Sequence, residues 1–189
     1  GGVLTAHKSI AMPGCSINNP TLTEADLRNL AVAKQYKVTD VMLPFVRNKA
    51  DLIILREALR EYGCEDIRIF AKIENMTGVE HLEELIPYCD YIVIARGDLG
   101  NAMPLSQLPR IQAHIARVCR KHNKDFMIVT QMLDSMIKNP YPTRAEVNDI
   151  YHAVTQGASA LMLTGETAHG KYPVEAMKML VDTAEESIL

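Results

Sequence analysis

Short apolar runs alternate with amphipathic stretches along the chain. Each run is too short for a helix and too uniformly apolar for a strand with one face in water, so each predicts a strand buried on both faces. The five runs are 40–46, 67–74, 91–99, 126–133 and 160–167.

The stretches between these runs carry signals for helix starts. A threonine is followed three residues later by an acid at three places, a spacing typical of a capping box. The three pairs are Thr23 with Asp26, Thr77 with Glu80, and Thr143 with Glu146. Pro173 predicts the start of the last helix, because a missing N–H costs nothing at the first helical position.

The alternation of strands and helices predicts a parallel α/β architecture. Two folds fit this pattern, a doubly wound open sheet and a TIM-type (β/α)₈ barrel. Only five strands can be counted, whereas a closed barrel has eight. Residues 1–20 have no helical period and predict an incoming segment rather than a complete βα unit.

Composition and charge narrow the class of protein. With 189 residues, 48% hydrophobic and 23% charged, the chain is typical of a soluble globular protein with one core. A net charge of −3 with scattered Lys and Arg argues against a nucleic-acid partner, and no apolar run is long enough to span a membrane. Four widely spaced cysteines without a C-x-x-C pair predict buried thiols in a reducing cytoplasm.

Polar residues gather at the carboxyl ends of the predicted strands, where parallel α/β folds bind ligands. Lys72 and Glu74 leave the same face of one strand, and Asp98 comes from the next. Two carboxylates on neighbouring strands, about 4.8 Å apart, repel unless a cation lies between them. Mg²⁺ is a suitable ion, and a nearby lysine suits phosphoryl transfer. Alternatively, Lys72–Glu74 and Arg96–Asp98 are ordinary ion pairs at a barrel rim.

Long ordered motifs make the whole chain resemble the pyruvate kinase family. The most specific are IFAKIENMTGV (69–79), IVIARGDLG (92–100), TQMLDSMIKNPYPTRAEVND (130–149) and LTGETAHGKYPVEA (163–176). The resemblance implies an incomplete TIM-type barrel at 13–189, preceded at 1–12 by the return segment of a lid domain that is missing here. By the same resemblance, the first three barrel strands and the regulatory domain are expected to lie outside this chain.

The resemblance also implies roles for matching residues. Lys72 would neutralise the phosphoryl group in flight, and Glu74 and Asp98 would bind the catalytic Mg²⁺, with Mn²⁺ as an alternative ion. Gly97 and Asp98 would offer N–H groups to the carboxylate of phosphoenolpyruvate, and Thr130 would contact substrate and help to deliver a proton. The reaction would transfer phosphate from phosphoenolpyruvate to ADP, giving pyruvate and ATP.

The resemblance implies further properties of a full-length enzyme. It would use K⁺, whose ligands lie mostly on the missing strands, and it would be a homo-oligomer, a tetramer in the full-length family. Arg144 would reach across the subunit interface.

The sequence departs from the family at three positions. Pro44 stands where the family usually has a serine that orients the lysine, and Asn101 and Ala102 replace a usual Val-Glu. With five strands, the isolated chain is expected to have little or no kinase turnover. Two other functions stay open: an Mg²⁺-dependent aldolase or lyase of a related barrel, and a non-catalytic, degenerate kinase module.

Overall fold

The computed structural model describes residues 19–188 and contains one five-stranded parallel sheet. The strands are β1 (Asp40–Leu43), β2 (Arg68–Ile73), β3 (Tyr91–Ala95), β4 (Phe126–Val129) and β5 (Ala160–Met162). The proposed return segment at 1–12 and Cys15 lie outside the described residues.

The strand order decides between the two predicted architectures. The strands are hydrogen-bonded in the order β1-β2-β3-β4-β5, and every pair is parallel. A doubly wound sheet reverses its order at a switch point, whereas a barrel adds each strand beside the previous one. The prediction of an incomplete (β/α) barrel with five strands is therefore confirmed. Within 19–188, β1 and β5 each have one neighbour and form the edges of the sheet.

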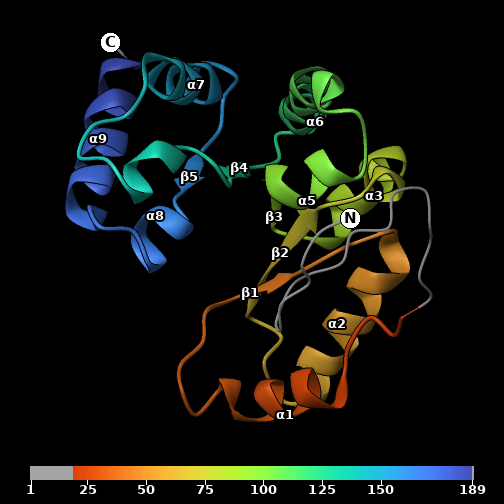
Figure 1. Ribbon diagram of the computed structural model, residues 1–189. Helices are drawn as coiled ribbons and strands as arrows, with labels where there is room; N and C mark the ends of the chain where they lie inside the picture. Colours follow the sequence, from red (N-terminus) through yellow and green to blue (C-terminus); the bar gives the residue numbers. More distant parts are fainter. Residues whose placement is uncertain (1–18, 189) are drawn as a thin grey trace, which may run out of the picture.

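Helices connect the strands and cover one face of the sheet (Figure 1). In Figure 1, α1 and α2 lie together toward the β1 end of the sheet, whereas α7, α8 and α9 gather at the β5 end. The α-helices are α1 (Glu24–Ala33), α2 (Lys49–Glu61), α3 (Met76–Glu80), α4 (Leu82–Leu85), α5 (Arg96–Asn101), α6 (Leu108–Lys121), α7 (Arg144–Thr155), α8 (Gly165–Ala168) and α9 (Pro173–Glu186). The 3₁₀ turns are η1 (Ile86–Tyr88), η2 (Leu105–Gln107) and η3 (Asp134–Ile137).

Most of the helix-start predictions are confirmed. Thr23 and Thr143 form reciprocal capping boxes, and Pro173 opens α9. The prediction at Thr77 is wrong, because Asn75 is the N-cap of α3 and its side chain accepts a hydrogen bond from Gly78 N–H. Asparagine caps at least as well as threonine, so the earlier residue begins the helix.

Alternate residues of the strands build two apolar layers. On β2, Ile69, Ala71 and Ile73 belong to the main core between sheet and helices. Phe70 faces the other side, where it forms a smaller cluster with Val93, Ala95 and Val129 on β3 and β4. On that inner face Lys72 follows Phe70, so the sequence period alone places a charged group at the carboxyl end of the barrel interior.

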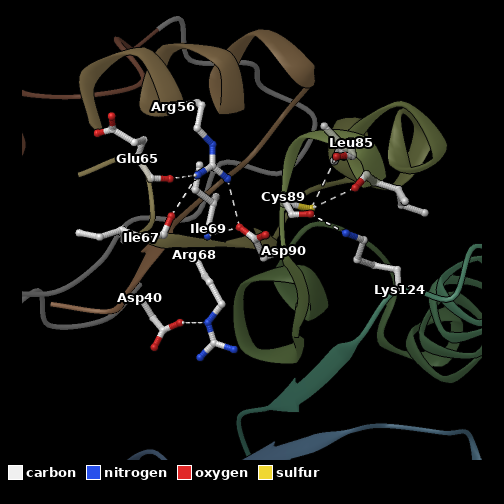
Figure 2. Close-up of polar contacts among 11 residues, drawn as sticks. Asp40, Arg56, Glu65, Ile67, Arg68, Ile69, Leu85, Cys89, Asp90 and Lys124 are labelled. Atoms are coloured by element: carbon white, nitrogen blue, oxygen red, sulfur yellow. Dashed lines mark hydrogen bonds and ion pairs between the residues drawn. The ribbon is translucent and has the colours of Figure 1, made fainter. Parts of the chain in front are cut away.

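Ion pairs and backbone contacts close the opposite, amino end of the sheet (Figure 2). Asp90 Oδ2 accepts hydrogen bonds from Ile69 N–H at 2.7 Å and from Arg56 Nη2 at 3.1 Å. Arg56 Nη1 also donates to the carbonyl oxygens of Glu65 and Ile67. Because these contacts join α2, β2 and the start of β3, we assign them to stability rather than to the site.

Candidate active site at the carboxyl ends of the strands

The apolar strands are shorter than the sequence predicts, and this changes how the polar residues are presented. β3 ends at Ala95, and Arg96 begins α5, so Asp98 lies in the first turn of a short helix rather than on the strand. Likewise β4 ends at Val129, and β5 ends at Met162. The polar residues thus lie on the loops and short helices that follow the strands. This is where barrel enzymes place their reactive groups.

Lys72 and Glu74 form an ion pair at the end of β2. Lys72 Nζ lies 2.7 Å from Glu74 Oε1, and the Glu74 side chain is 1% exposed while that of Lys72 is 25% exposed. Glu74 Oε2 accepts a hydrogen bond from Phe45 N–H at 2.8 Å. The pair predicted as a rim interaction is therefore present. Each carboxylate oxygen keeps a free lone pair, so the contacts still allow Glu74 to bind a metal ion.

The loop after β1 holds this end of β2. Val46 N–H donates to Lys72 O at 3.2 Å, and Asn75 Nδ2 donates to Val46 O at 3.3 Å. Pro44 has neither a side-chain donor nor an N–H, and the next two residues supply the backbone donors instead. Lys72 is thus oriented through Glu74, without a serine at position 44.

Gly97 and Thr130 are packed against each other. A Cβ atom added to Gly97 would lie 2.9 Å from Thr130 Cγ2, closer than ordinary contacts allow. Only glycine therefore fits at position 97 while Thr130 keeps its place. Arg96, Gly97 and Asp98 form the first turn of α5, where N–H groups have no intrahelical acceptor.

Thr130 and Gln131 both have left-handed backbones, with φ of 76° and 54°. For a β-branched residue such as threonine this conformation is unfavourable by about 1–3 kcal/mol and persists only where its surroundings impose it. Arg96 imposes it here. Its guanidinium donates to Thr130 O at 2.8 and 3.1 Å and to Gln131 O at 3.1 Å.

Asp149 on α7 is the acidic partner of Arg96. Arg96 Nη1 lies 2.6 Å from Asp149 Oδ2, so the predicted alternative of an Arg96–Asp98 pair is wrong. This contact could not be predicted from the sequence, because it spans 53 positions and no local spacing points to it. Asp98 is exposed on the first turn of α5.

The residues predicted to bind metal and substrate follow three adjacent strands. Glu74 follows β2, Gly97 and Asp98 follow β3, and Thr130 follows β4. Among residues 19–188 no group of three or more His, Cys, Asp or Glu side chains is arranged to hold a metal. Two carboxylates suffice for Mg²⁺, which keeps several waters and takes further oxygens from its substrate. The donor set therefore fits this ion.

Comparison with known proteins decides the family. The family model described as "Pyruvate kinase, barrel domain" matches residues 1–177. The chain belongs to the pyruvate kinase family.

Curated relatives from distant organisms match the chain almost end to end. A pyruvate kinase of Clostridium acetobutylicum is 40% identical over 98% of this chain, and one of Thermotoga maritima is 39% identical over 99%. A pyruvate kinase of Candida albicans is 40% identical over 99% of the chain. The chain spans about two fifths of the length of these relatives, covering 39%, 40% and 38% of them.

Proposed function

We propose that this chain is the part of a pyruvate kinase that holds the metal and the phosphoryl-transfer lysine. The observation that carries the proposal is the Lys72–Glu74 pair at the carboxyl end of β2, beside the strand end that bears Gly97 and Asp98. The family match makes transfer of phosphate from phosphoenolpyruvate to ADP the reaction to test.

Each residue would contribute a distinct part of this chemistry. Glu74 and Asp98 would hold Mg²⁺, or Mn²⁺ in its place, and the bound ion would neutralise charge on the phosphoryl and carboxylate oxygens of the substrate. Lys72 would place its ammonium against the phosphoryl group in transit, and the Glu74 carboxylate keeps that ammonium oriented at 2.7 Å. This electrostatic support would act when negative charge spreads over the transferring group.

The substrate carboxylate would lie against the start of α5. The N–H groups of Gly97 and Asp98 lie in its first turn, where they can donate to an anion. Thr130, in contact distance of Gly97, would place its hydroxyl beside the same substrate and take part in delivering a proton to the enolate carbon.

Binding to the chain itself tests this proposal without requiring turnover. We expect calorimetric titration to show Mn²⁺ binding that is strengthened by phosphoenolpyruvate and lost in Glu74→Gln and Asp98→Asn. Glu80→Gln, which alters an exposed acid on α3, serves as the matched control. Wild-type binding that survives both substitutions would overturn the proposed metal site.

Assays on the same chain can distinguish the kinase proposal from the two alternative functions. A coupled assay for pyruvate should show little turnover by this chain alone, since within residues 19–188 β1 and β5 each lack one of the two neighbours that a strand of a closed barrel has. Release of pyruvate from oxaloacetate would instead favour the aldolase or lyase. A folded chain that binds neither Mn²⁺ nor phosphoenolpyruvate would favour the non-catalytic module.

We further propose a homo-oligomer, a tetramer in the full-length protein, with Arg144 at its interface. The support is that Arg144 is exposed as the first residue of α7. Sedimentation of the full-length Arg144→Ala variant should show weaker assembly than the wild type. Dependence on K⁺ belongs to the same full-length proposal.

We also propose a cytoplasmic location. Cys64, Cys89 and Cys119 are free and buried, as is typical of a reducing compartment. No helix in the described part of the chain has the length and hydrophobicity to cross a bilayer.

A further inference from the structure

Glu166 is a buried acid that binds backbone N–H groups rather than a cation. It lies on α8, is 1% exposed, and has no Lys, Arg or His nitrogen within 4.0 Å in the described part of the chain. Its Oε1 accepts from Leu133 N–H at 3.1 Å. Its Oε2 accepts from Thr164 N–H at 2.8 Å and from Thr164 Oγ1 at 3.3 Å.

These contacts keep the carboxylate charged in spite of its burial. Burial raises the pKa of Glu166, but hydrogen bonds from the N–H groups of Glu166 itself, Thr164 and Leu133 outweigh this effect and leave the pKa below its ordinary value. A buried carboxylate without such donors would be strongly unfavourable. The charged carboxylate therefore binds two loops, the one after β4 and the one after β5.

The loop after β4 is anchored by opposite charges on its two sides. Arg96 binds the carbonyl oxygens of Thr130 and Gln131, and Glu166 binds the N–H of Leu133. The left-handed pair lies between the end of β4 and Leu133. A loop fixed at its carbonyl groups alone could still rotate beyond Gln131, and the contact at Leu133 removes this freedom.

We propose that Glu166 is a positioning residue that fixes Thr130 against Gly97 by holding the backbone of Leu133. The link to catalysis rests on the proposed function, in which Thr130 contacts substrate. The position of Thr130 itself can be measured without catalysis.

Glutamine at position 166 is the sharpest change, because it keeps the size of the side chain. A carboxylate can accept at both oxygens, whereas an amide accepts at one and donates at the other. Glu166→Gln must therefore place an NH₂ group against Leu133 N–H or against Thr164 N–H. Glu175→Gln, an exposed acid in the first turn of α9, removes the same charge without these contacts.

Hydrogen exchange and methyl NMR on this chain test the proposal. In the wild type, Leu133 N–H should exchange at least about tenfold more slowly than Asp134 N–H, which begins η3 and has no helical acceptor. In Glu166→Gln, exchange at Leu133 or Thr164 should accelerate about tenfold, and the Thr130 methyl resonance should shift or double. Glu175→Gln should leave both readouts unchanged.

Three results would overturn the proposal. The first is equal exchange at Leu133 and Asp134 in the wild type, which needs no variant and decides the matter even if Glu166→Gln does not fold. The second is an unchanged Thr130 methyl in folded Glu166→Gln. The third is a Thr130 methyl shift of the same size in an equally destabilised variant at the amino end of the sheet, such as Asp90→Ala, as loss of stability alone would give.

The proposed function fails on different evidence. If the wild type binds Mn²⁺ and phosphoenolpyruvate but the Thr130 methyl resonance is unchanged in Glu166→Gln, only the positioning role is wrong. If Thr130 moves in Glu166→Gln while the wild type binds neither ligand, the positioning role holds and the kinase proposal is wrong.

Discussion

The guanidinium of Arg96 joins the carboxylate of Asp149, 2.6 Å away on α7, to the backbone of the loop that follows β4. Arg96 is 9% exposed, and its other donors reach Thr130 O and Gln131 O. One buried cation therefore stabilises two unfavourable left-handed residues and fixes α7 against them. Removal of the cation leaves carbonyl oxygens and a carboxylate without their partner.

We predict that Arg96→Met destabilises the chain by about 3 kcal/mol, since it leaves the carbonyl oxygens of Thr130 and Gln131 and the partly exposed Asp149 carboxylate without their donor. Arg96→Lys should lose less stability, because it keeps the positive charge. It should still lose some, because it lacks the planar set of donors. Urea unfolding measures both. Arg28→Met is the control, because the Arg28–Glu24 pair is exposed at 3.8 Å and should contribute less than about 1 kcal/mol. Equal losses at positions 28 and 96 would contradict the assigned role.

We predict that Gly97→Ala and Gly100→Ala have opposite effects although both glycines lie in α5. A Cβ at position 97 meets Thr130 Cγ2 at 2.9 Å, so the substitution should displace Thr130 and destabilise the chain by about 1–3 kcal/mol. At position 100 the nearest atoms are 3.6 Å away, and helix propensity should stabilise the chain by up to about 1 kcal/mol. Melting curves and the Thr130 methyl resonance check both variants. Destabilisation of equal size at both positions would contradict the close packing of Gly97 on Thr130.

The sequence is sufficient to predict the parallel sheet and the gathering of polar residues at the carboxyl ends of its strands. The alternation on β2 correctly brings Lys72 and Glu74 to one face, where they form an ion pair, because the strand period is two and does not depend on distant residues. The predicted end of the third strand was too late, at residue 99 instead of Ala95. Leu99 is apolar because it is buried in the main core from α5, and its sequence position alone does not distinguish this from a strand residue.

The contacts that fix the loop after β4 could not be predicted in the same way. Arg96 finds its acid 53 positions away, and Glu166 binds an N–H 33 positions away. Such contacts depend on how α7 and α8 pack on the sheet. Nothing in the motif around either residue specifies this packing. The sequence also gives no signal for the left-handed backbone of Thr130, since threonine normally disfavours this conformation.

We predict that Glu146 contributes stability that is lost in acid. Burial raises the pKa of Glu146, but hydrogen bonds from Ser135 and Thr143 outweigh it and lower the pKa below the ordinary 4.5. Because the pKa is lowered on folding, the contribution is complete above pH 4.5 and disappears as the pH falls through the lower value of the folded state. Glu146→Gln should therefore cost about 1 kcal/mol at pH 7 and less at pH 3.

Urea midpoints at the two pH values measure this difference for Glu146→Gln. Glu61→Gln, an exposed acid at the end of α2, should change neither midpoint appreciably. A cost at position 146 that is as large at pH 3 as at pH 7 would show that the carboxylate charge is not what binds Ser135 and Thr143.

We predict, finally, that Asp90 stabilises the sheet without affecting ligand binding. Asp90→Ala removes the acceptor of Ile69 N–H and the partner of Arg56 at the amino end of the strands, and should cost about 1–3 kcal/mol in urea unfolding. Asp90→Asn should cost less, because one amide oxygen can still accept both hydrogen bonds. The exposed Asp125, which directly precedes β4, provides the control variant Asp125→Ala. Mn²⁺ affinity should be the same in all folded variants, because the proposed ligands lie at the other end of the sheet; weaker binding in Asp90→Asn would contradict this division between a stabilising and a reactive end.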